Sequence, residues 1–184
     1  MKRIVSILAL LLCMTCVQAE EHMKFMGIPL NGTISQFQAK LTAKGLVLDV
    51  ALNRQLSIGC RAFKGSFSGK DAQVYVYYDE ATKIVYRAKA VIESSEESLS
   101  EQNYDYFVSM LSQKYDDAEK KYGRQDSYET VTFLVPNNNE YATYTYLGSI
   151  DVYRSSYSFT YDVHVDYTDA INIVKHENRN MEDL

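Results

Sequence analysis

The stretch QVYVYYDEATKIVYRAKAVI (residues 73–92) decides the fold class of this 184-residue chain. Apolar and polar side chains alternate in residues 73–78 and again in residues 84–92, with a polar turn between them. Alternation with a period of two is typical of a strand with one buried face, and two such runs joined by a short turn predict an antiparallel hairpin. We expect short strands ahead of this hairpin, over residues 46–50 and 56–63.

A first helix is expected before these strands, starting near residue 33. Thr33 and Gln36 have the spacing of a capping box, in which each side chain bonds to the backbone N–H of the other residue. The apolar side chains that follow recur at intervals of three and four and form one buried stripe: Ile34, Phe37 and Leu41. Gly45 provides the left-handed residue at which such a helix ends.

A second, longer helix is predicted after the hairpin. Apolar and aromatic side chains recur along one face from Tyr104 to Tyr122. Ser98 or Ser100 is the expected N-cap, and Gly123 is the expected end. Strands are expected to resume over residues 130–135, 141–147, 150–154 and 157–167, with a last short strand or extended tail near 171–174 and a polar, frayed tail from His176.

The order of helix, strands, helix and strands predicts an α+β fold, with an antiparallel sheet of two meanders and both helices packed on one face. Residues 74–81 and 163–170 share the pattern V-x-V-x-Y-x-(D/E)-A at an offset of 89 residues. This match favours an internal duplication with repeats 25–93 and 104–174. Ordinary strand composition produces the same pattern, so both origins stay open.

Residues 1–19 have the three parts of a secretory signal peptide. Lys2 and Arg3 precede an apolar run, and VQA at residues 17–19 matches a cleavage site. The run is shorter than the roughly 20 residues that a permanent membrane-spanning helix needs. We therefore expect a single exported domain of residues 20–184, periplasmic or secreted, with no transmembrane segment in the mature chain.

The cysteines and the net charge disfavour several further classes of protein. Bacterial lipidation requires a small residue directly before the modified cysteine, and Leu12 before Cys13 and Thr15 before Cys16 disfavour a lipid-anchored form. Cleavage removes both of these cysteines and leaves Cys60 alone, so no intramolecular disulfide is expected. The mature chain then carries 17 basic and 24 acidic residues, a net charge of −7, which argues against nucleic acid as a partner.

Three segments resemble small exported proteins of gut anaerobic bacteria that have no characterised function. They are F-x-G-I-P-L-x-G from Phe25 running into the first helix, the stretch Tyr104–Tyr122, and Val163–Ala170. The helix-then-meander repeat is similar to the architecture of the β-lactamase inhibitor protein and of small outer-membrane assembly lipoproteins. This resemblance implies a fold and brings no active site with it, and the chain lacks the disulfides of the inhibitor.

Tyrosine is the compositional outlier, with 16 tyrosines and no tryptophan. Tyrosine offers rigid amphipathic area at low entropy cost and is therefore common at binding surfaces, although it also favours strands in general. Tyrosines crowd the second meander on both strand faces, so at least one row of them should reach solvent. The candidate binding residues are Tyr141, Tyr144, Tyr146, Tyr153, Tyr157 and Tyr161.

No catalytic or metal-binding motif stands out, and we expect no cofactor. Cys60 with His164 as its base is a nucleophile candidate, but the alternation beside it favours a buried structural thiol. The histidines are isolated and there is no cysteine pair, so no metal site is predicted. Asp162 and Asp166 on the last long strand are the carboxylates to consider for hydrolysis.

The leading hypothesis is a non-enzymatic exported binding module that uses a tyrosine-rich sheet face for a protein, peptide or glycan. One alternative is an envelope hydrolase, or an accessory subunit of one, that uses Asp162 and Asp166. Two carboxylates of raised pKa in a deep cleft would favour this alternative. The other alternative is an envelope assembly factor.

Overall fold

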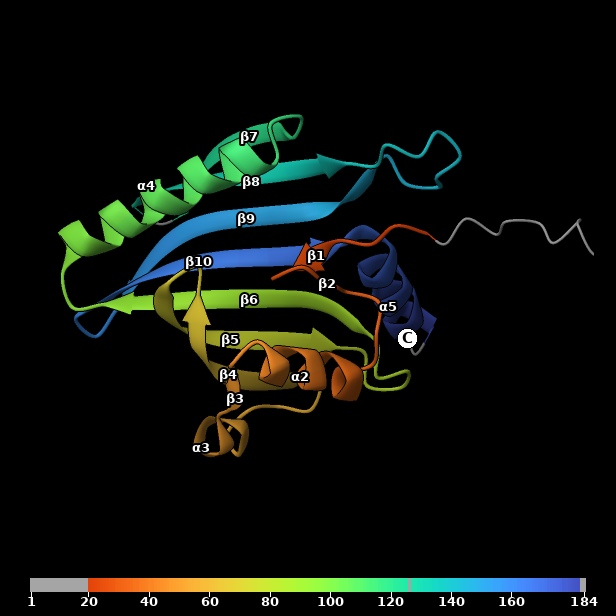
Figure 1. Cartoon of the computed structure of the whole chain (residues 1–184), viewed down its shortest axis with the longest axis horizontal. Coiled ribbons are helices and arrows are strands. Elements are labelled where there is room, and N and C mark those ends of the chain that lie inside the picture. Colours follow the sequence, from red (N-terminus) through yellow and green to blue (C-terminus); the bar gives the residue numbers. More distant parts are fainter. Residues whose placement is uncertain (1–19, 126, 183–184) are drawn as a thin grey trace, which may run out of the picture.

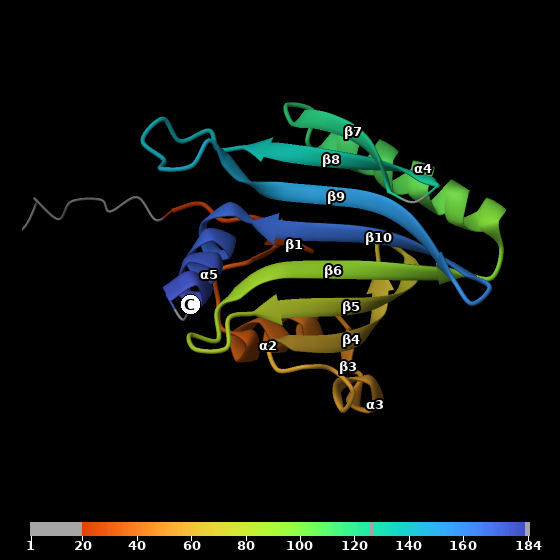
Figure 2. The ribbon, with the colours of Figure 1, turned by 180° about the vertical axis from the view of Figure 1, so that it is seen from behind.

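The computed structural model describes residues 20–125 and 127–182. The expected signal peptide, with Cys13 and Cys16, lies outside the described residues. The described part forms an eight-stranded antiparallel sheet, a separate two-stranded hairpin and four helices, which confirms the predicted α+β class. Figure 1 shows the large sheet with α4 lying along its upper strands, and Figure 2 shows the same sheet from behind.

The first half of the chain supplies one side of the large sheet. Two short strands pair with each other ahead of the first described helix and stay outside the large sheet. The elements in chain order are β1 (Lys24–Phe25), β2 (Ile28–Pro29), α2 (Ile34–Ala43), β3 (Val47–Leu48), α3 (Val50–Asn53), β4 (Cys60–Phe67), β5 (Lys70–Tyr78) and β6 (Val85–Ser94).

The second half supplies the other side and repeats the order of a helix followed by four strands. A last helix then follows directly on the final strand. The elements are α4 (Glu97–Lys114), β7 (Glu119–Gln125), β8 (Tyr128–Pro136), β9 (Tyr146–Tyr157), β10 (Thr160–Asp169) and α5 (Ala170–Glu182).

The strand order β3-β4-β5-β6-β10-β9-β8-β7 is that of two four-stranded meanders, which meet where β6 pairs with β10. The two predicted meanders are therefore confirmed. The 89-residue sequence match places Val74 on β5 and Val163 on β10, the third strand of one meander and the fourth of the other. The match does not follow the topological repeat, and the internal duplication stays a prediction.

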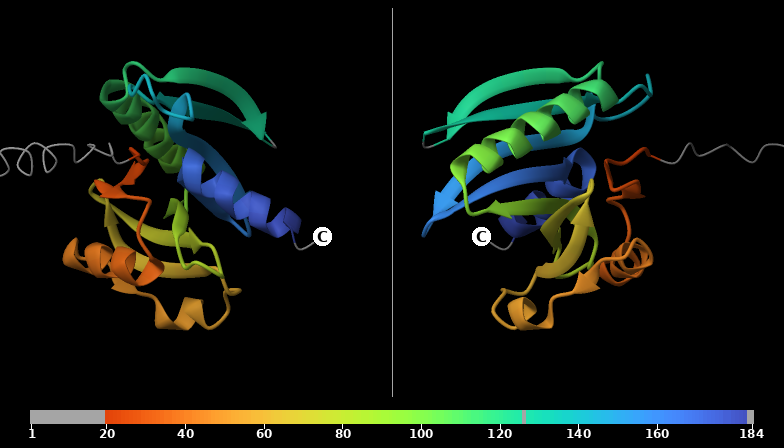
Figure 3. Two further views of the ribbon diagram at one scale, coloured as in Figure 1. Left: turned by 90° about the vertical axis from the view of Figure 1, so that its right-hand side faces the viewer. Right: turned by 60° about the vertical axis from the view of Figure 1, so that its left-hand side comes forward.

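The hydrophobic core lies between the sheet and the helices α2 and α4, which cover the same face of it (Figure 3). Phe25 of the β1–β2 hairpin sits at its centre, stacked on Phe67 and edge-on to Tyr167, with 5.3 Å between ring centroids in both pairs. Phe107 of α4 joins the same cluster through its contact with Phe67. Burying one such ring stabilises the fold by about 1.5–3 kcal/mol, so this cluster holds hairpin, helix and sheet together.

The start and the end of α2 are as the sequence predicts. The Thr33 hydroxyl accepts a hydrogen bond from the backbone N–H of Gln36, and the Gln36 side chain accepts one from Thr33 N–H. Gly45 adopts a φ of +90°, which a residue with a Cβ rarely does. The predicted hairpin is also confirmed, as β5 and β6.

The second helix is shorter than predicted. The helix α4 ends at Lys114, and the segment assigned to its last turns becomes the edge strand β7, on which Tyr122 is 75% exposed. Neither predicted serine caps it, because the N-cap is Glu96, without a side-chain bond. Ser100 is instead buried in the first turn, where its hydroxyl accepts a hydrogen bond from Arg154 at 3.2 Å. Pairing with β8 decided the end of the helix, and helical periodicity does not carry that information.

Three strand predictions are also corrected. The predicted strand 46–50 is cut to two residues because Asp49 caps the short helix α3, accepting a bond from Leu52 N–H at 3.0 Å. The predicted strand 141–147 is mostly a loop that runs to the start of β9. The segment predicted as a short strand or extended tail near 171–174, with a frayed end, is the helix α5, because the Asp169 carboxylate accepts the backbone N–H of Asn172 at 2.9 Å.

Helix α5 is anchored to the β5–β6 turn through the buried carboxylate of Asp79. This carboxylate accepts bonds from Ala81 N–H and from the N–H and hydroxyl of Thr82, and it pairs with His176 and Arg179 of α5. The His176 ring also stacks on Tyr86 at 4.4 Å. Burial would raise the pKa of Asp79, but its bonds to Thr82, His176 and Arg179 outweigh burial and lower the pKa well below its usual range.

Asp79→Ala should lower the free energy of unfolding by about 2–3 kcal/mol at neutral pH, because it removes the counter-charge of Arg179 and the acceptor of several hydrogen-bond donors. A carboxylate whose pKa is depressed by folding stabilises the fold only while it is ionised. The difference between wild type and variant should therefore be complete above about pH 4 and shrink as the pH falls further. Urea unfolding across this pH range measures it, with the exposed neighbour Glu80→Ala as a control expected to change stability by less than about 0.5 kcal/mol.

Candidate functional site

The face of the sheet opposite α2 and α4, here called the open face, carries the polar side chains of the alternating strands. Directly opposed residues of antiparallel strands point to the same face, so the register sets these side chains in rows across β6, β10 and β9. The first row is Lys89, Asp166 and Asp151, with Tyr75 of β5 beside Lys89. The second row is Val91, His164 and Tyr153, with Gln73 beside Val91. The third row is Glu93, Asp162 and Ser155.

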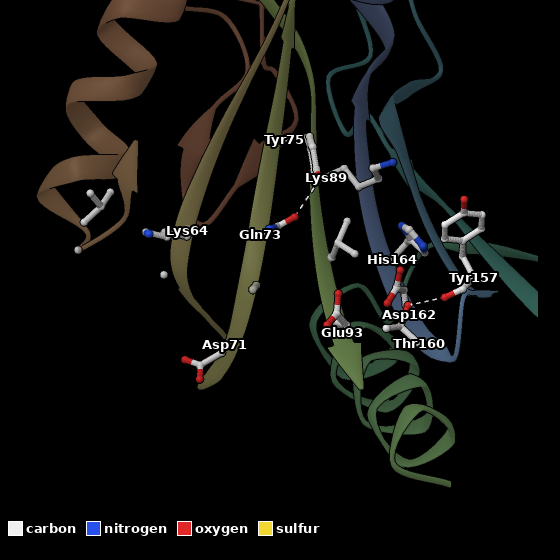
Figure 4. A pocket seen from close by; sticks show the side chains of 15 residues that line it. Lys64, Asp71, Gln73, Tyr75, Lys89, Glu93, Tyr157, Thr160, Asp162 and His164 are labelled. Carbon is white, nitrogen blue, oxygen red and sulfur yellow. Dashed lines mark hydrogen bonds between the residues drawn. The ribbon is translucent and has the colours of Figure 1, made fainter. Parts of the chain in front are cut away.

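The open face is hollowed by a cavity of about 820 Å³, here called the hollow. Its floor is formed by side chains of β5, β6 and β10, and Tyr157 and Thr160 border it at the β9–β10 turn (Figure 4). A volume of this size falls within the range of small-ligand sites. The floor includes the side chains of Tyr75, Lys89, Val91, Glu93, Asp162 and His164.

Next to the hollow, Arg87 and Asp166 form a bidentate ion pair. Arg87 Nε donates to Asp166 Oδ1 at 2.8 Å, and a second guanidinium nitrogen donates to Oδ2. The guanidinium lies 4.9 Å from the centroid of the Tyr77 ring, and the Asp166 residue is only 2% exposed. The bond to Asp166 raises the pKa of Arg87 further above its ordinary value. Both oxygens of Asp166 are therefore engaged within the protein.

His164 stands in the middle of the open face in its neutral form. Its ring stacks on Tyr153 with 4.4 Å between centroids, and Nε2 lies 2.8 Å from the Ser155 hydroxyl. Burial, with the positive charge of Lys89 nearby, lowers the pKa of His164 to about 4. The other ring nitrogen, Nδ1, is buried and has no hydrogen-bond partner.

The third row makes one end of the hollow acidic. Asp162 and Glu93 face each other across β6 and β10, and Asp162 Oδ1 is buried without a hydrogen-bond partner. Burial, with the charge of Glu93 beside it, raises the pKa of Asp162. In the described part of the chain three buried side-chain polar atoms lack a hydrogen bond, and Asp162 Oδ1 and His164 Nδ1 are two of them. Buried polar groups of folded proteins nearly always have partners, so these two atoms point to a group that the chain itself does not supply.

Lys89 lies toward the opposite end of the hollow. Its ammonium nitrogen is 5.6 Å from the centroid of the Tyr75 ring, a cation–π distance. The Tyr75 hydroxyl in turn donates to Gln73 Oε1 at 2.9 Å. Burial lowers the pKa of Lys89, which means that its charge lacks the solvation it has in water. A bound anion would restore that stabilisation.

The six tyrosines singled out from the sequence do not form one surface. Tyr153 and Tyr157 lie on the open face, at its centre and at the rim of the hollow. Tyr141, 89% exposed, and Tyr144 belong to the loop before β9, and the Tyr146 hydroxyl donates to Glu119 of β7 at 2.5 Å.

Tyr161 has the alternation of the core-facing positions of β10 and so points to the helix side. The two open-face tyrosines that the prediction missed are Tyr75 and Tyr77 of β5. Because they alternate with Val74 and Val76, the sequence could have predicted that these two tyrosines lie on the face opposite the core.

The catalytic and metal candidates stay apart. Cys60 lies on β4, and Tyr77 and Arg87 stand between it and β10, which carries His164. Burial raises the pKa of the Cys60 thiol, which is the opposite of what a nucleophile needs. Within residues 20–125 and 127–182, no three histidine, cysteine or acidic side chains are grouped so that they could hold a metal ion.

Comparison with known proteins assigns no family. No family model matches the chain, and neither a curated protein sequence nor a solved structure is significantly similar to it. Of the helices that the structure describes, none is both long and apolar enough to span a membrane.

The imidazole of His164 should titrate with a midpoint near pH 4, well below the ordinary value of about 6.5. Lys89→Met should raise this midpoint, because it removes a positive charge that opposes protonation. Proton NMR of the ring resonances measures both values. Lys121→Met, at the far edge of the sheet, is the matched control and should leave the midpoint where it is; a midpoint near 6.5 in the wild type would contradict the burial of this ring.

Proposed function

We propose that the chain is an exported, non-enzymatic binding module that holds a protein, peptide or glycan ligand on the open face of its sheet. The observation that carries the proposal is the hollow, whose floor contains two buried polar atoms without partners. The signal-like residues 1–19 support export, either to the periplasm or out of a bacterial cell. Aromatic and charged side chains together give the hollow both contact area and orientation-dependent bonds.

The open face is more polar than a structural role requires. Its rows contain three aspartates, a glutamate, a histidine and a lysine, whereas the opposite face of the same strands is filled with valine, alanine and isoleucine. A sheet face that only met solvent would leave its charges fully hydrated. Here Lys89, Asp162 and His164 are partly desolvated in a concave site, which is typical of residues that meet a ligand.

The same contacts give the hydrolase alternative less support. Asp162 has a raised pKa and lines the hollow, as an acid catalyst would, but both carboxylate oxygens of Asp166 are hydrogen-bonded to Arg87. The second carboxylate of raised pKa, Asp151, is bonded to the Thr132 hydroxyl and lies outside the residues that line the hollow. The predicted pair of Asp162 and Asp166 is therefore not available at the hollow for acid–base hydrolysis. No described contact bears on a role as an assembly factor.

Val91→Arg tests the proposal, because Val91 is half-buried at the centre of the hollow and an arginine there fills it. Peptide and glycan arrays probed with wild-type protein should give hits that the Val91→Arg variant loses by at least tenfold in signal. Val50→Arg makes the same change at an exposed site on α3 and should keep every hit. Thermal melts of both variants check that the fold is retained.

The proposal is wrong if hits are retained by a folded Val91→Arg variant, since the ligand then binds elsewhere. It is equally wrong if neither array yields a hit with the wild-type protein. A hit that both variants lose would indicate a general effect of positive charge, and would also count against the hollow.

A further inference from the structure

We infer that the hollow binds a short peptide with free termini, with its ammonium group between Glu93 and Asp162 and its carboxylate on Lys89. This inference rests on the proposed function and names the ligand of the same site.

The acidic end fits a primary ammonium group. Glu93 and Asp162 are directly opposed on neighbouring strands, which lie about 4.8 Å apart. An ammonium ion between these two side chains can bond to both carboxylates with its three donors. It also gives Asp162 Oδ1 the donor that it lacks. Asp71, which also lines the hollow, adds a third negative charge near this end.

The opposite end fits a carboxylate. Lys89 precedes Glu93 by four residues on the same face of β6. Neither of its neighbours in the row, Asp166 or Tyr75, fully neutralises the charge of its ammonium group. Asp166 is already paired with Arg87, and Tyr75 offers the face of its ring. A ligand carboxylate at Lys89 replaces the solvation that burial takes from the ammonium group.

The separation of the two ends sets the length of the ligand. Four residues along a strand span about 13 Å at roughly 3.3 Å per residue. An extended peptide covers at most about 3.3–3.6 Å per residue, so a chain of three or four residues reaches from one end to the other. Longer peptides with both termini at these charges would have to bulge away from the floor.

Between the ends, the floor offers partners for peptide groups. Val91 provides an apolar contact, and Gln73 and His164 flank it in the second row. When His164 Nε2–H donates to the Ser155 hydroxyl, Nδ1 is an acceptor, and a peptide N–H supplies its missing bond. Gln73 accepts from Tyr75 through Oε1, so its amide nitrogen can donate to a peptide carbonyl.

A neutral sugar is a poorer match for the same floor. Its hydroxyl groups can bond to His164 and Gln73, but they leave both charged ends of the hollow without counter-charges. An acidic or a basic ligand alone pairs one end and leaves the other desolvated. Only a ligand with a positive and a negative group about 13 Å apart neutralises both ends at once.

Isothermal titration with tetraalanine, and with a pool of tetrapeptides that have free termini, tests the inference. N-acetylation or C-terminal amidation of tetraalanine should each weaken binding at least tenfold. Asp162→Asn and Glu93→Gln should weaken binding of the free peptide by a similar factor and have little effect on the acetylated one. Lys89→Met should likewise weaken binding of the free peptide and have little effect on the amidated one. Glu119→Gln and Lys121→Met are the matched controls, because they remove one negative and one positive charge from β7 at the far edge of the sheet. Both should leave peptide affinity unchanged.

The outcomes separate this inference from the proposed function. Equal affinity of free and blocked peptides, or no binding of either peptide probe, overturns the peptide assignment. If a glycan or a diamine without a carboxylate then binds and Val91→Arg abolishes that binding, the proposed function stands with a different ligand. If no array ligand depends on Val91, both fail together.

Discussion

The pairing of β6 with β10 is the contact on which the rest of the structure depends. It joins two meanders that would otherwise be separate four-stranded sheets, each with an unpaired edge at this point. The same register brings together Arg87 and Asp166, 79 residues apart in the sequence, in an ion pair whose carboxylate is buried. It also sets Glu93 opposite Asp162, so one strand pairing creates both the continuous core on one face and the acidic end of the hollow on the other.

The two faces of the β6–β10 pair are stabilised by different interactions. On the helix side, alanine and valine of β6 and β10 pack against the cluster around Phe25, and shape and apolar area stabilise the contact. On the open face, the same strands carry charges that burial disfavours unless they are paired. Arg87 and Asp166 satisfy each other, whereas Asp162 and His164 each keep an unpartnered atom. The hollow is therefore the part of the sheet where the chain leaves its own bonding incomplete.

Much of the fold could be predicted from local pattern. The capping box of Thr33 and Gln36, the stop at Gly45 and the alternation in residues 73–92 all act over a few residues, and the structure confirms them. The errors came where a distant partner overrides the local pattern. Tyr122 continued a helical stripe until pairing with β8 made it part of a strand, and the polar C-terminal segment became a helix because Asp79 and Asp169 offered it partners.

By itself, the sequence determined the α+β class and the two meanders, because these follow from periodicity and composition. It also identified tyrosine as unusual, but it favoured the second meander and missed Tyr75 and Tyr77. The tertiary structure decided which of these side chains share a surface. Membership of the open face depends on strand register, and shifting a strand by one residue would exchange the face that carries His164 and Asp162 for the one that carries Val163 and Val165.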